Sequence, residues 1–223
     1  MAVRKFKYEF DGVHYYRFSV YRLGSNVQTV YTFVLDDVLI DTAQSHNRDN
    51  ILQVAKDHHI AKIILTHHHE DHSGNVAFLM DELDIDAFAH PETVRILKKG
   101  IKVSPLSRLL SGDVAGAHLK PLAETDRIVT EKYSLQPIYT PGHCSDHYCY
   151  YEAEKGWMSR RDDRVRYSHD QHGGMDGQWR PLDGYFNSPS GARLFQPHDQ
   201  NAPLSETANC RCFLLYRLRY RDE

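Results

Sequence analysis

Four histidines and two acidic residues occupy six consecutive positions in the stretch ILTHHHEDHSGN, directly after an apolar run. His67 and His69 are two residues apart, so in an extended loop their side chains project the same way. Asp71 and His72 follow, where a helix is expected to begin. Imidazole nitrogens and carboxylate oxygens are ligands that zinc and similar metals take. The stretch therefore predicts a metal site rather than a set of surface histidines.

Two further motifs accompany this stretch in the order and separation of a known family. VLIDT (Val38 to Thr42) precedes it, and TPGHCSDH (Thr140 to His147) follows it. With the spacing His-x-His-x-Asp-His between a buried strand and a helix, the chain resembles the metallo-β-lactamase superfamily. THHHEDHSGN is most similar to stand-alone hydrolases of that superfamily, whose substrates are varied or unassigned.

The resemblance implies a ligand set. By it, His67, His69 and His143 would hold a first metal, while Asp71 and His72 would contribute to a second. The metal expected is Zn²⁺, one or two per chain, with Fe or Mn as alternatives.

The resemblance also implies a reaction, in which bound metal activates a water that attacks an ester, thioester, lactone or phosphodiester. Asp71 would be the catalytic residue that orients the nucleophile or accepts its proton. Asp41 would steady a ligand imidazole from behind. His68 and Glu70 are interpreted as exposed residues without a ligand role, and His147 and Tyr148 either line the pocket or belong to the core.

Hydrophobic patterning predicts an α/β chain with a mainly β beginning. Strands are expected over residues 14–23, 29–42 (with a turn at Asp36-Asp37), 61–66, 86–90, 133–143 and 147–157. Helices are expected over residues 47–59, with Asn47 as N-cap, 72–83 and 91–100. The resemblance implies a metallo-β-lactamase-like αββα sandwich, incomplete in its second half.

Two ligands of that family have no clear counterpart. An aspartate that bridges both metals is expected soon after YCYYEAEKGW, yet MSRRDDRVRYSH follows with no apolar strand and no Gly-Asp. Asp162 and Asp163 lie in a charged run, which is typical of a solvated loop. Three histidines remain candidates for the terminal ligand: His169, His172 and His198.

The composition changes after Trp157, because the chain from Met158 onward contains arginines but no lysine and is rich in turn-forming residues. DDRVRYSHDQHGGMDGQW and NCRCFLLY resemble the C-terminal part of phage Mu F-like minor head proteins. Two domains are predicted: residues 1–157 as the metallo-β-lactamase-like part and residues 158–223 as an Arg-rich, loop-rich segment. Cys210 and Cys212 are interpreted as partly buried on a final strand rather than as metal ligands.

The two resemblances meet near Trp157, and this junction leaves alternatives to an active hydrolase. One is a fragment of a phage head structural protein, and another is a chimeric chain with an incomplete, inactive site. A gene fusion, a frame or assembly error, or an artificial sequence would each produce such a junction. A junction inside a fold argues against an evolved two-domain protein.

Composition limits which classes of binding partner and which cellular location the sequence predicts. The net charge of −3 argues against a general nucleic-acid or anionic-membrane binder, so a small-molecule substrate is expected. No apolar run is long enough to span a bilayer, and the start lacks a secretory signal. Four cysteines in 223 residues do not form a disulfide framework, so a reducing, cytoplasmic location is predicted.

Overall fold

A computed structural model of the protein describes residues 2–10, 12–152 and 157–159. Its larger sheet has seven strands in the order β1-β2-β3-β4-β5-β6-β7. The first three are long antiparallel strands, β1 (Ala2–Phe10), β2 (Val13–Arg22) and β3 (Ser25–Leu35). Four shorter strands follow: β4 (Val38–Ile40), β5 (Lys62–Ile64), β6 (Asp86–Ala89) and β7 (Lys120–Pro121).

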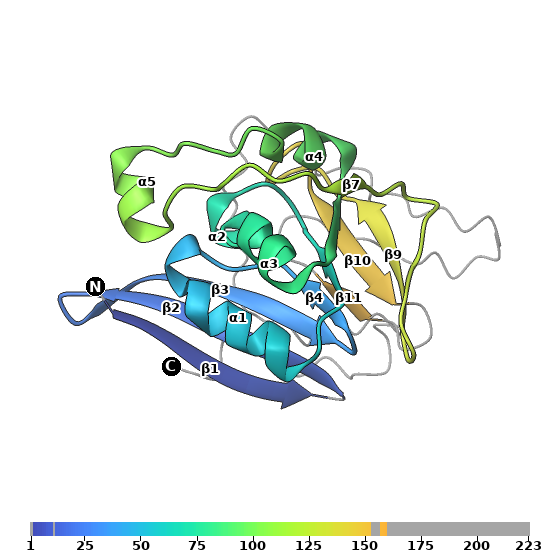
Figure 1. Ribbon diagram of the computed structural model, residues 1–223, viewed down its shortest axis with the longest axis horizontal. Helices are drawn as coiled ribbons and strands as arrows, with labels where there is room; N and C mark the ends of the chain where they lie inside the picture. The colour runs from blue at the N-terminus through green and yellow to red at the C-terminus, as the bar shows by residue number, and fades with distance from the viewer. Residues whose placement is uncertain (1, 11, 153–156, 160–223) are drawn as a thin grey trace, which may run out of the picture.

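The strands β4 to β7 pair in parallel, so each connection between them has to cross over the sheet. The crossovers contain α1 (Arg48–Asp57), α3 (Val76–Leu83) and α4 (Pro91–Leu97). Figure 1 shows α1 and α3 lying across the same face of this sheet. Three shorter elements complete the crossovers: the 3-10 helix Ser45–Asn47, α2 (Glu70–Ser73) and α5 (Pro105–Leu110).

A second, antiparallel sheet packs on the opposite face of the first. Its order is β11-β10-β9-β8, built from β8 (Ile128–Val129), β9 (Ser134–Tyr139), β10 (Tyr148–Glu152) and β11 (Trp157–Ser159). The described residues thus form a helix layer, a seven-stranded sheet and a four-stranded sheet, in that order.

An apolar core lies on each face of the larger sheet, because successive side chains of a strand point to opposite faces. Leu39 and Ile63 face the helices and pack in the core that contains Ile51 and Leu79. Ile40 and Ile64 face the other way, into the core shared with the second sheet, which includes Leu135, Tyr148 and Tyr150. The short strands β4 and β5 are therefore buried on both sides, as parallel strands usually are.

The predicted α/β class is confirmed, and so are the turn at Asp36-Asp37 and the helix that starts after Asn47. One predicted helix differs: residues 72–83 form two helices, α2 and α3, separated at Gly74 and Asn75. The sequence analysis does not include the strand β1 or the helix α5. Lys5 to Phe10 alternate polar and apolar residues, a signal typical of a strand, whereas α5 buries none of its residues.

The break between α2 and α3 follows from close packing against the loop after β4. A Cβ on Gly74 would lie 2.5 Å from the Ser45 nitrogen and 2.6 Å from the Ala43 oxygen, so only glycine fits there. The Asn75 amide nitrogen donates to the carbonyl oxygens of Thr42 (2.7 Å) and Gln44 (2.8 Å). The Ser-Gly-Asn that follows the histidine cluster thus fixes this loop.

Most of the segment 158–223 lies outside the described residues. This holds for Asp162, Asp163, His169, His172 and His198, and for Cys210 and Cys212. The division into two domains and the similarity to phage Mu F-like proteins stay predictions. Within the described part, every helix is too short or too polar to cross a bilayer.

The Asn75 contacts predict a stability effect. Asn75→Ala leaves the buried Thr42 carbonyl oxygen without this donor, whereas the Gln44 carbonyl oxygen keeps the Asn47 backbone N–H at 2.9 Å. Losing the partner of a buried acceptor costs about 1–3 kcal/mol. We expect chemical denaturation to show a loss of about 1–3 kcal/mol in the free energy of unfolding. The exposed Asn26 provides the control, since Asn26→Ala should change that value by less than about 0.5 kcal/mol. Equal effects of the two substitutions would contradict this account.

Candidate metal centre

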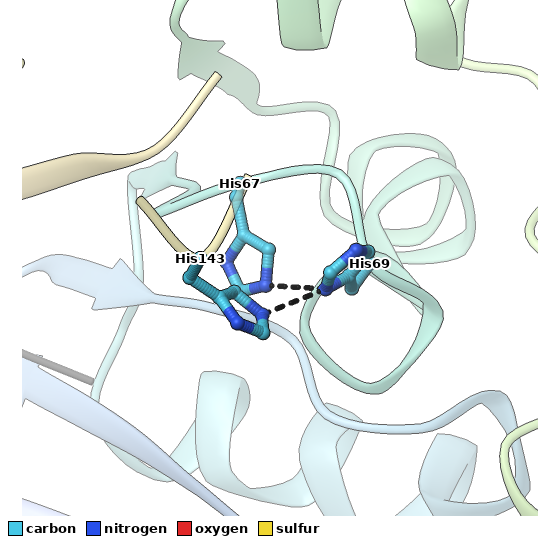
Figure 2. A group of neighbouring side chains, drawn as sticks. All are labelled: His67, His69 and His143. Carbon is cyan, nitrogen blue, oxygen red and sulfur yellow. Dashed lines mark hydrogen bonds between the residues drawn. The ribbon is translucent and has the colours of Figure 1, made fainter. Parts of the chain in front are cut away.

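Three histidine side chains converge at the carboxyl ends of the central parallel strands. His67 follows β5, His69 precedes the first turn of α2, and His143 lies in the loop between β9 and β10. The His69 Nδ1 atom lies 3.0 Å from His67 Nε2 and 2.9 Å from His143 Nε2 (Figure 2). His67 is fully buried, whereas His69 and His143 are half-buried. The structure therefore brings together the three histidines predicted for a first metal.

A buried carboxylate behind the cluster fixes the tautomer of His67. Asp41 accepts from the Thr66 backbone nitrogen (2.8 Å) and from the Thr66 hydroxyl (2.8 Å). A carboxylate can only accept, so the single hydroxyl proton of Thr66 goes to Asp41. The His67 Nδ1 atom, 2.9 Å from the Thr66 oxygen, must then carry the ring proton and donate it. The unprotonated Nε2 atom of His67 consequently faces His69.

The same carboxylate orients His72. The His72 Nδ1 atom donates to Asp41 across 2.7 Å, so Nε2 is the nitrogen on the other side of the ring. That nitrogen lies 3.6 Å from an Asp71 oxygen, and the His72 ring centroid is 4.5 Å from that of His67. The predicted second-metal ligands therefore lie beside the first cluster. The expected role of Asp41 behind an imidazole agrees with this geometry.

The cluster has the chemistry of a divalent cation site. The His69 Nδ1 atom lies about 3 Å from a ring nitrogen of each of the other two histidines, and one ligand atom from each of the three lies within 4.8 Å of the others. Nitrogens whose lone pairs face one another at such distances repel unless a proton or a cation lies between them. Three imidazoles with a fourth position left open is a ligand set that zinc takes in catalytic sites. Asp71 and His72 are not part of any group of three or more candidate ligands within the described residues. The first position is thus the better defined of the two.

His147 and Tyr148 are both buried behind the cluster. The His147 ring centroid is 5.2 Å from that of His67, and its Nδ1 atom is paired with the Thr140 hydroxyl at 2.8 Å. Burial lowers the pKa of His147 to about 4, so this imidazole is neutral at neutral pH. Tyr148 donates its hydroxyl to the Leu122 carbonyl and its backbone nitrogen to the Thr66 carbonyl. Tyr148 thus belongs to the core shared by the two sheets, whereas His147 is buried against the histidine cluster, with its ring 6.3 Å from that of His143.

One sequence interpretation is wrong. His68 and Glu70 were expected to be exposed residues of the motif, but both are half-buried. Only 23% of the His68 side chain is exposed, and its Nδ1 atom lies 2.9 Å from the buried Asp146 carboxylate. Thr66 and Asp146 were not singled out from the sequence at all. Each carried a usable signal: Thr66 is a polar residue that ends an apolar strand, and Asp146 lies within TPGHCSDH.

The chain is similar to known proteins. The family model described as the metallo-beta-lactamase superfamily matches residues 27–159. A hydroxyacylglutathione hydrolase of Hahella chejuensis is 29% identical over 89 residues, 40% of this chain and 27% of that protein. Its counterpart from a Marinomonas species is 30% identical over 93 residues, 42% of this chain and 28% of that protein. The matched region thus spans just over a quarter of the length of these relatives.

Solved structures agree on the fold. A subclass B3 metallo-beta-lactamase of Bradyrhizobium japonicum superposes with a TM-score of 0.51 at 20% identity, covering 66% of this chain and 56% of that one. A metallo-beta-lactamase of Cronobacter sakazakii gives a TM-score of 0.55 at 18% identity, covering 70% of this chain and 63% of that one. At such identities the likeness concerns the fold alone, and it confirms the predicted metallo-β-lactamase-like architecture.

The contacts of Thr66 predict a change in metal affinity. Thr66→Val removes the hydroxyl that accepts from His67 and donates to Asp41, so the His67 ring loses its orienting partner. Losing such a partner typically weakens metal affinity about 10–100-fold, as a Zn²⁺ competition titration would measure. Thr66→Ser keeps the hydroxyl and should bind like the parent. A valine variant with unchanged affinity would show that the hydroxyl does not orient the ligand.

Proposed function

The chain belongs to the metallo-beta-lactamase superfamily, and from that premise we propose that it is a metal-dependent hydrolase whose metal is held first by His67, His69 and His143. The observation that carries the proposal is the convergence of the three ring nitrogens, with the His67 tautomer fixed by Thr66 and Asp41. Zn²⁺ is the metal we expect, because three imidazoles and an open position suit it.

In this proposal a bound divalent cation supplies Lewis-acid activation of a water and of the substrate's carbonyl or phosphoryl oxygen. Asp71 and His72 would contribute to a second metal position. Asp71 is buried and lies beside His72, which supports the proposal that its carboxylate would orient the nucleophilic water or accept a proton from it.

Asp41 would have a positioning role. It is buried and accepts directly from His72 Nδ1, and it acts on His67 through the Thr66 hydroxyl, which donates to Asp41 and accepts from His67 Nδ1. The neutral His147 adds no positive charge beside the ligands. The chain's own residues thus keep lone pairs and negative charge directed at the place where a cation would bind.

A small-molecule thioester is the substrate class we propose to test first. The two curated relatives are named hydroxyacylglutathione hydrolases, and a hydroxyacylglutathione is a thioester. Esters, lactones and phosphodiesters are the other classes that the same hydrolytic chemistry would serve.

The test combines metal content with hydrolysis. We expect the full chain, purified and loaded with Zn²⁺, to keep at least one tightly bound metal and to hydrolyse a hydroxyacylglutathione thioester. His69→Ala removes the nitrogen that lies within 3.0 Å of both other histidines, so it should lose the metal and at least about 100-fold of the activity. His118→Ala, at an exposed histidine, should keep both.

Two results would contradict the proposal. Metal retained at full stoichiometry in His69→Ala would mean that the cluster is not the binding site. Metal bound by the parent without hydrolysis of any of the four substrate classes would leave a metal-binding chain that is not a hydrolase.

A further inference from the structure

We propose that the hydrogen bonds between His68 and the buried Asp146 carboxylate, called the tie below, set the separation of two loops. One loop follows β5 and carries His67 and His69, and the other precedes β10 and carries His143. His68 and Asp146 would both be positioning residues, and neither would need to touch the metal or the substrate. The inference deepens the proposed function and rests on it, because the loops matter only if the histidines that they carry bind metal.

The tie has several hydrogen bonds at its Asp146 end. Asp146 is fully buried and accepts from the His68 backbone nitrogen (3.1 Å) and from His68 Nδ1 (2.9 Å). The Thr93 hydroxyl of α4 donates to the same carboxylate across 2.6 Å. Because a carboxylate only accepts, His68 carries its proton on Nδ1. Three segments distant in sequence therefore meet at one carboxylate.

His68 and Asp146 are close in sequence to the three histidines, so the hydrogen bonds between them would affect the positions of these ligands as well as the stability of the fold. His68 lies between His67 and His69, and Asp146 lies three residues after His143. A second connection joins the same loops, since the Tyr148 backbone nitrogen donates to the Thr66 carbonyl across 2.8 Å. With both connections in place, the loop that ends β5 and the loop before β10 cannot slide past each other. The His69–His143 distance of 2.9 Å depends on that alignment.

The carboxylate stays charged within the tie. Burial by itself would raise the pKa of Asp146, but hydrogen bonds from His68, Thr93 and Cys144 outweigh it and hold the pKa well below the usual range. A buried carboxylate that loses one of its donors is strongly penalised, so the loop retains a preference for the position in which His68 reaches it. The tie therefore favours one particular position of the His68 loop relative to Asp146.

A competing interpretation is a separate metal site. One ligand atom each from His68, Cys144 and Asp146 lies within 4.8 Å of the others, which would suit a small cation. The hydrogen bonds favour the tie, because Asp146 already accepts from His68 N, His68 Nδ1 and the Thr93 hydroxyl as well as from Cys144, and His68 Nδ1 must carry a proton. A metal would have to displace these donors.

Titration of the metal-free full chain with Co²⁺ tests the tie, with visible absorption as the readout of ligand geometry. His68→Ala removes the Nδ1 donor, and His68→Asn places an amide N–H where the imidazole holds Nδ1–H. We expect His68→Ala to weaken Co²⁺ binding about 10–100-fold and to change the cobalt bands. His68→Asn should restore most of the affinity and the parent spectrum, and His118→Ala should behave as the parent.

Asp146→Asn provides a second variant from the other end of the tie and should weaken binding in the same direction. Melting curves of the metal-free variants ensure that every titration is made on folded protein. Because only folded protein is titrated, a shift of the cobalt bands in His68→Ala reports the positions of the ligands and not a loss of stability, and rescue by His68→Asn assigns that shift to the lost donor.

The outcomes that overturn the inference are distinct. If the parent binds Co²⁺ and His68→Ala binds it equally, with the same bands, the tie does not position the ligands although the proposed centre stands. If the parent binds no Co²⁺, the proposed centre fails and the tie fails with it. An extra Co²⁺ with thiolate charge-transfer absorption, kept in His69→Ala and lost in His68→Ala, would identify the cluster as a metal site instead.

Discussion

The candidate site depends on one buried interaction, the hydrogen bonding of the Asp41 carboxylate. Asp41 follows the short strand β4 with a φ of 63°, an uncommon backbone conformation that turns the chain across the end of β5. In that position it accepts from Thr66 and from His72. Removing this charge would leave the Thr66 hydroxyl and the His72 ring without a defined acceptor, so the orientation of two candidate ligands would be lost together.

The two sheets make this arrangement possible because they bring both loops to the same edge. The strands β4 and β5 are buried on both faces, which fixes their ends, and Tyr150 on β10 donates its hydroxyl to the Leu65 carbonyl just before the cluster. Ligands in α/β proteins commonly bind beyond the carboxyl ends of parallel strands. Here the second sheet adds His143 from the opposite side, so the site lies where the two layers meet.

Much of this could be predicted from the sequence, because the ligand types and their spacing follow local rules. The strand, loop and helix around His67 and His69 follow from an apolar run and a helix start, and VLIDT and TPGHCSDH lie in the expected order. The contacts of Thr66 and of His68 with Asp146 could not be predicted, because they join residues that only the fold brings together. Neither could the split at Gly74, which depends on the backbone of residues 43 to 45.

The central claim is that three imidazole nitrogens bind one metal, and X-ray absorption at the zinc edge of the Zn²⁺-loaded full chain tests it most directly. The account predicts three histidine nitrogens at about 2.0–2.1 Å, with the multiple-scattering pattern of imidazole rings, and a remaining shell of oxygen. A sulfur shell at about 2.3 Å would place the metal at Cys144 or another cysteine instead. A shell of oxygens without imidazole scattering would likewise contradict the account.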